Sequence, residues 1–68
     1  MLRTLRVTWM PRYQIHFVDH GDNIFSTRHV EEPDDEKAIT TARRLHVPSI
    51  GAGFEVWESE RLVHRERR

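Results

Sequence analysis

The chain has no cysteine among its 68 residues, which excludes disulfide bonds, thiol nucleophiles and thiolate metal sites. The absence of cysteine also fits a reducing compartment, so we expect a cytoplasmic protein. Long hydrophobic runs are missing as well. No apolar stretch approaches the ~18 residues that a membrane span needs, and Arg6 interrupts the N-terminal segment that a secretory signal would occupy. We therefore expect a protein without a membrane partner.

An excess of one charge is also missing, because eleven basic residues balance eleven acidic ones. The charges are nevertheless segregated along the chain. Residues 19–36 hold seven acids and one base, whereas residues 1–18 hold three bases and no acid. A chain without a strong cationic excess lacks the usual driving force for non-specific nucleic-acid binding.

Alternating apolar residues predict the first strands. Residues 12–18 alternate, a Gly- and Asn-containing turn follows, and residues 24–30 return as the second strand of a hairpin. Residues 4–9 alternate too, and Pro11 then interrupts the ladder. This segment is either an extra edge strand or an extension upstream of a translation start at Met10.

A helix is predicted after the first hairpin. Asp34 is a natural N-cap and acids fill the first turn, where the helix dipole favours them. One narrow apolar stripe follows, and Pro48 ends the helix. The stripe consists of Ala38, Ile39, Ala42 and Leu45. Because these side chains are small, we expect the helix to pack closely on a flat sheet face.

A second hairpin is predicted from residues 54–58 and 61–65, with a frayed tail over residues 66–68. Regular ladders would create the following pairs: Val18 with Ile24, Phe17 with Phe25, Ile15 with Thr27, Val56 with Val63, and Trp57 with Leu62. The element order is β-β-α-β-β, a small α+β domain over residues 10–65 in which one helix covers one face of an antiparallel sheet.

The second hairpin is apolar on both faces, since the last two of those pairs point to opposite sides. A sheet with its helix on one face leaves the other face open, and apolar residues on an open face mark a partner surface or a homodimer seam. We therefore predict an interface formed by Trp57, Leu62, Val7 and Trp9. Alternatively, the strand at residues 4–9 or the loop at Ile50 covers this face within one chain.

The alternative function is weak nucleic-acid binding by the basic C-terminal strand and tail next to Trp57. The bases are Arg61, Arg65, Arg67 and Arg68. Acids are interleaved with these bases, which also fits a solvated edge strand that resists aggregation.

Metal and catalytic sites are disfavoured. His16 and His20 are the densest histidine pair, yet residues four apart on a strand are separated by roughly 13 Å, too far to share one ion. The glycines at 51 and 53 follow the predicted helix, whereas a phosphate loop precedes one. No serine has a recognisable base partner. We expect a non-enzymatic protein without a metal or cofactor.

The stretch Met10-Pro11-Arg12-Tyr13 is followed by His16, by Asp19 and Gly21 in a turn, and by Ala38 and Ala42 in the helix. With these residues the chain resembles a family of very short uncharacterised bacterial proteins, common in alphaproteobacteria, that begin Met-Pro-Arg-Tyr-aromatic-aromatic-His. The resemblance covers residues 10–65, although Gln14 and Ile15 replace the aromatic pair. It implies the β-β-α-β-β order and a start at Met10, and it transfers no catalytic or binding residues.

Overall fold

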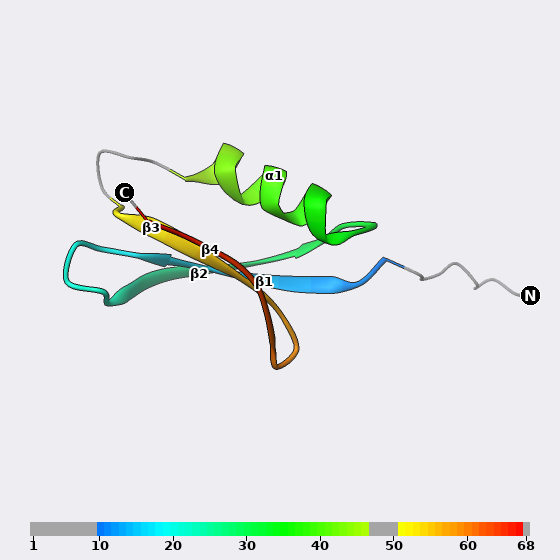
Figure 1. Cartoon of the computed structure of the whole chain (residues 1–68), viewed down its shortest axis with the longest axis horizontal. Coiled ribbons are helices and arrows are strands. Elements are labelled where there is room, and N and C mark those ends of the chain that lie inside the picture. The colour runs from blue at the N-terminus through cyan, green and yellow to red at the C-terminus, as the bar shows by residue number, and fades with distance from the viewer. Residues whose placement is uncertain (1–9, 47–50, 68) are drawn as a thin grey trace, which may run out of the picture.

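The computed structural model describes residues 10–46 and 51–67. These residues form four strands and one helix: β1 (Arg12–Val18), β2 (Ile24–Glu31), α1 (Asp35–Leu45), β3 (Gly53–Glu58) and β4 (Arg61–Arg67). All neighbouring strands are antiparallel, in the order β2-β1-β3-β4, and α1 lies over one face of the sheet (Figure 1). The predicted α+β fold is confirmed. The strand expected at residues 4–9 lies outside the described residues.

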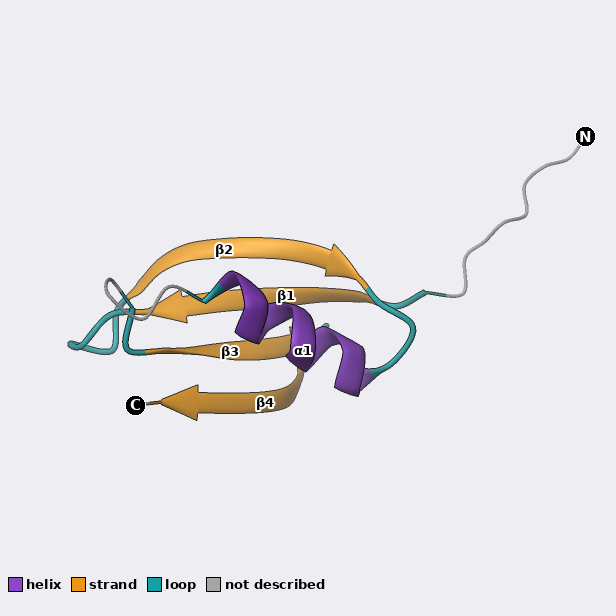
Figure 2. Ribbon diagram, turned by 90° about the horizontal axis from the view of Figure 1, so that it is seen from above, coloured by secondary structure: helices purple, strands orange, loops and turns teal. Residues whose placement is uncertain are grey.

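The core lies between α1 and the two central strands, which the helix crosses in Figure 2. It contains side chains from β1, from β3 and from the helix: Tyr13, Ile15, Phe17, Phe54, Val56, Ala38 and Ala42, all buried. Both alanines are fully buried, so the small stripe does let the helix approach the sheet closely. Asp34 caps the helix as predicted, because its carboxylate accepts the backbone N–H of Lys37 at 2.8 Å.

The register of the first hairpin differs from the expected regular ladder. Val18 does pair with Ile24, but Phe17 pairs with Ser26 and not with Phe25. The predicted pairing of Ile15 with Thr27 is also wrong, by the same one residue. A β-bulge next to the turn inserts Phe25 as an extra residue, and every pair beyond it shifts.

The second hairpin is shifted in the same way. Trp57 pairs with Leu62 as predicted, whereas Val56 pairs with His64 and not with Val63. Ser59 in the turn adopts the left-handed region at φ 52°. A β-bulge beyond the Trp57–Leu62 pair leaves Val63 as an extra residue in β4.

The prediction of a frayed tail from residue 66 is wrong for Glu66 and Arg67, because both residues belong to β4. Glu66 pairs with Phe54, and Arg67 pairs with Gly53. A Cβ at Gly53 would overlap the Glu66 carbonyl oxygen, so glycine at this position lets the end of β4 lie against β3. Backbone pairing and the missing side chain together hold the end of the strand.

Candidate interaction surface

The sheet face opposite α1 is the candidate surface, and we call it the open face. Because side chains alternate along a strand and directly paired residues share a face, two complete rows can be assigned to it. One row across β2-β1-β3-β4 is His29, Gln14, Trp57 and Leu62, and the next is Thr27, His16, Glu55 and Arg65. Among the described residues, the only helix covers the other face (Figure 1).

Trp57 and Leu62 form the apolar part of the open face. They are direct cross-strand partners, so they lie side by side at the end of the sheet near the second turn. Leu62 is 40% exposed, and Trp57 is half-buried. The Trp57 indole N–H donates to the Glu55 carboxylate at 2.9 Å, which holds the ring against the strand. The structure thus brings together the two predicted interface residues that it describes. Val7 and Trp9 lie outside the described residues.

Glu55 is the polar centre next to this pair. One carboxylate oxygen accepts the Trp57 N–H, and the other accepts the Arg65 Nε–H at 3.0 Å. The Glu55 side chain is only 13% exposed. The Trp57 hydrogen bond, and then the Arg65 and Arg67 cations, hold the pKa of Glu55 below its usual range. The carboxylate therefore stays charged and fully partnered, and a contacting molecule would not strand an unpaired charge.

The other half of the open face is polar. The Nδ1 atom of His16 lies 3.0 Å from the Thr27 hydroxyl, and the Nε2 atom of His29 lies 3.3 Å from the Gln14 side-chain nitrogen. His20 lies in the first turn. Within residues 10–46 and 51–67, no group of three or more acidic or histidine side chains is placed to hold a metal ion.

The arginines of the alternative function lie on two faces of the sheet. Arg61 lies on the α1 side, where it binds Asp35 at 3.0 and 3.1 Å and also Glu58. Arg65 and Arg67 lie on the open face, where both approach Glu55, and Arg67 also pairs with Asp22. Each of the three therefore has an acidic partner. Arg68 lies outside the described residues.

A second polar cluster, which the sequence analysis missed, anchors the helix start to the sheet. The hydroxyl of Tyr13, a side chain 1% exposed, donates to Asp35 at 2.8 Å, and Arg61 binds the same carboxylate. Burial, followed by the contact with Asp35, raises the pKa of Tyr13 to about 12. No spacing in the sequence indicates this cluster, because its members are 22 and 26 residues apart. Glu55 was missed too, although its position two residues before Trp57 places both on one strand face.

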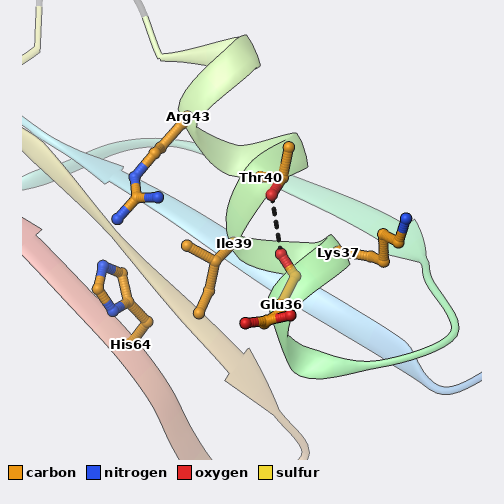
Figure 3. Close-up of a pocket in the computed structure, with 6 residues that line it drawn as sticks. All are labelled: Glu36, Lys37, Ile39, Thr40, Arg43 and His64. Carbon is orange, nitrogen blue, oxygen red and sulfur yellow. Dashed lines mark hydrogen bonds between the residues drawn. The ribbon is translucent and has the colours of Figure 1, made fainter.

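A groove of about 490 Å³ lies between α1 and β4, and Figure 3 shows its lining. Ile39 lines it together with polar side chains, among which Arg43 and His64 point toward each other (Figure 3). Both contact the Glu66 carboxylate at 3.0 Å, so the polar groups that line this groove already have partners within the chain. The groove is therefore a weaker candidate for a binding site than the open face.

Comparisons with family models, with curated proteins and with solved structures give no match to this chain. The resemblance to the short alphaproteobacterial proteins stays a prediction. The one described helix is too short and too polar to cross a membrane.

Proposed function

We propose that this protein is a small non-enzymatic interaction module that binds a second copy of itself through the open face. The observation that carries the proposal is the pair Trp57 and Leu62, an apolar patch beside a carboxylate whose hydrogen bonds are already satisfied. An apolar patch on a sheet face that the one described helix does not cover is stabilised when another surface removes it from water.

The shape of the face supports a second sheet as the occupant. Four strands ~4.8 Å apart, with about seven residues rising ~3.3 Å each, give a flat area of roughly 440 Å². Stable interfaces bury about 800 Å² per partner, so the whole face has to take part and the contact belongs to the weak, concentration-dependent class. A twisted sheet matches another twisted sheet packed ~10 Å away. A second copy supplies that shape and, with zero net charge, adds no overall repulsion.

The charged residues of the open face also permit this contact. Glu55 with Arg65 and Arg67 forms a locally compensated group, and Arg12 lies 3.8 Å from Glu31. Ion pairs closed within one chain can enter an interface without leaving a lone buried charge. Trp57 is then the expected centre of the contact, since tryptophan is enriched among residues that dominate binding energy.

The test is light scattering on the full chain across about a hundredfold range of concentration. We expect at least twice the monomer mass at high concentration, and we expect it to persist in about 0.5 M salt because apolar burial is not screened. Trp57→Ala should weaken the association about thirtyfold, the effect of about 2 kcal/mol. The matched control is Ile24→Ala, which removes an apolar side chain 54% exposed at the first turn, away from the patch. A monomer at every concentration, or equal association by Trp57→Ala and the parent, overturns the proposal.

The dependence on salt concentration separates self-association from nucleic-acid binding. Phosphate contacts weaken steeply with salt, and they would depend on Arg65, whose partner Glu55 competes for its charge. Binding of a labelled oligonucleotide at low salt that is lost at high salt and in Arg65→Ala would establish the alternative function.

A further inference from the structure

The two edges of the sheet, β2 and β4, differ in how they are protected. Charged residues make up four of the seven positions of β4, three of them arginine. Strand β2 has eight residues and only two charges, Arg28 and Glu31. Its first two residues, Ile24 and Phe25, are exposed apolar side chains. Edge strands are usually blunted by charge against pairing with other chains, and only β4 has this protection.

The backbone of β2 offers a row of free hydrogen-bonding groups. The Glu32 N–H donates to the Pro11 carbonyl at 3.2 Å, which fixes the direction of the antiparallel ladder. Because backbone groups alternate in direction, Arg28 and Val30 direct theirs toward β1, and His29 and Glu31 direct theirs outward. Within the described residues, no strand lies on that side of β2.

We propose that β2 pairs antiparallel with β2 of a second copy, with Val30 on the two-fold axis. This register joins the outward-facing backbone groups of His29 and Glu31 across the axis. It also places Arg28 opposite Glu32 of the second copy, and His29 opposite Glu31 of the second copy. The two valines then face each other as a close pair on the α1 side of the sheet.

Charge disfavours two competing arrangements. Moving the axis to Arg28 would place this arginine opposite its own copy, which is destabilising. On the other edge, the residues of β4 with outward-facing backbone include Arg65 and Arg67. Antiparallel registers that join these groups place Arg65 opposite either Arg65 or Arg67 of the second copy. Within the described strands, β2 in the Val30-centred register therefore combines free backbone groups with a self-complementary charge pattern.

This contact is independent of the open face. A two-fold axis perpendicular to the sheet extends it to eight strands and leaves both helices on one side, and neither Trp57 nor Leu62 takes part. Two coplanar open faces would also double the area that can stack. An extended peptide from another protein is the rival occupant of the β2 edge, and disulfide cross-linking separates this peptide from a second copy of the chain.

The experiment uses the absence of cysteine from the chain. In the full-length protein, Val30→Cys should give a disulfide-linked dimer under mild oxidation, because Cα atoms of a close antiparallel pair lie ~4.5 Å apart, within disulfide range. Thr27→Cys should not cross-link, since the two copies of residue 27 would lie roughly 20 Å apart at ~3.3 Å per residue. His64→Cys, on the α1 side of β4, controls for the opposite edge. Cross-linking at Val30→Cys no greater than at His64→Cys overturns the proposal, as expected if a peptide from another protein occupies this edge.

A second variant covers the case in which a half-buried Val30→Cys perturbs the fold. His29→Pro removes one outward-facing N–H and leaves the backbone hydrogen bonds between β1 and β2 intact, because proline is tolerated where the N–H of an edge strand faces away. The associated mass of the otherwise unchanged chain should fall with His29→Pro and persist with His29→Ala, which removes the same side chain from the open face but keeps the outward-facing N–H. An associated mass unchanged by His29→Pro would show that β2 pairing does not occur.

Discussion

The two faces of the sheet are stabilised by different interactions. On the α1 side, seven buried residues form the core, among them Phe54 and Val56 with no exposed surface. On the open face, cross-strand hydrogen bonds and ion pairs join polar side chains around one apolar pair. Apolar burial contributes about 25 cal/mol per Å², whereas exposed ion pairs contribute 0–1 kcal/mol each. The comparison indicates that the α1 side holds the fold together and the open face is free to change with function.

The largest expected effect is on the α1 side. Phe54→Ala removes a fully buried ring that packs near Phe17 and His46, with ring centroids 6.4 and 5.8 Å away. Truncating a buried phenylalanine costs about 3–5 kcal/mol. Urea unfolding followed by circular dichroism would measure the loss. The control is Ile24→Ala, an exposed apolar truncation expected to stay within about 0.5 kcal/mol. Equal losses in the two variants would contradict the assignment of the core.

The next effect concerns the close approach of β4 to β3. Gly53→Ala places a Cβ against the Glu66 carbonyl, and the atoms nearest to this Cβ, in Glu66 and Arg67, are all backbone atoms. Relieving such an overlap requires a shift of β4, and we expect a loss of about 2 kcal/mol. Gly21→Ala is the matched control, because its new Cβ would meet side-chain atoms alone, Asn23 Nδ2 at 3.2 Å and Asp19 Oδ1 at 3.5 Å. Faster hydrogen exchange in β4 of Gly53→Ala would locate the change. Unchanged exchange there would show that β4 does not depend on this glycine.

A smaller effect comes from the polar anchor between α1 and the sheet. Tyr13→Phe removes the hydrogen bond to Asp35 and leaves the buried ring in place. We expect a loss of about 1 kcal/mol in the free energy of unfolding. The pH dependence of the Tyr13 contribution to stability follows from its pKa, which the fold raises from 10.0 to about 12. The contribution is complete below pH 10 and is lost as the pH rises through about 12. Stability measured across this range should fall in the parent and fall less in Tyr13→Phe.

At low pH the carboxylates act in the opposite direction. Arg61 lowers the pKa of Asp35, and Trp57 lowers that of Glu55, in each case as the largest cause. Their contributions are present above the unfolded values of about 4 and are lost as the pH falls through the lower folded values. Glu55→Gln keeps an acceptor for the indole N–H but cannot be charged. Its unfolding free energy should therefore depend less on pH below about 4 than that of the parent. An identical dependence would exclude Glu55 as a contributor.

Local patterns predicted the elements of the fold, because alternation and helix capping act over a few residues. The cap at Asp34, the buried alanines and the pair Trp57 with Leu62 were all readable in this way. The bulges at Phe25 and Val63 were not predictable in this way. An extra residue shifts the pairing with the neighbouring strand, but the apolar and polar residues on each side of it still alternate as in a regular strand.

The candidate site was predictable only in its apolar part. Trp57 and Leu62 follow from the hairpin, and Glu55 follows from the strand period once Trp57 is chosen. The partners of Arg61 do not follow, because Asp35 lies 26 residues away and meets it only after the helix has packed. Charged side chains in the C-terminal strand look like one basic surface in the sequence, whereas the strand period divides them between two faces.

The smallest expected effect sharpens the comparison of the two faces most directly. Leu62→Ala truncates a side chain 40% exposed, so in dilute protein it should change the free energy of unfolding by no more than about 0.5 kcal/mol. At concentrations where copies associate, the parent should gain stability with concentration, because association favours only the folded chain. Leu62→Ala should gain less, while Ile24→Ala should follow the parent. Unfolding midpoints at two concentrations measure both effects. A large loss in dilute protein would make Leu62 part of the core, and equal gains in parent and variant would remove it from the contact.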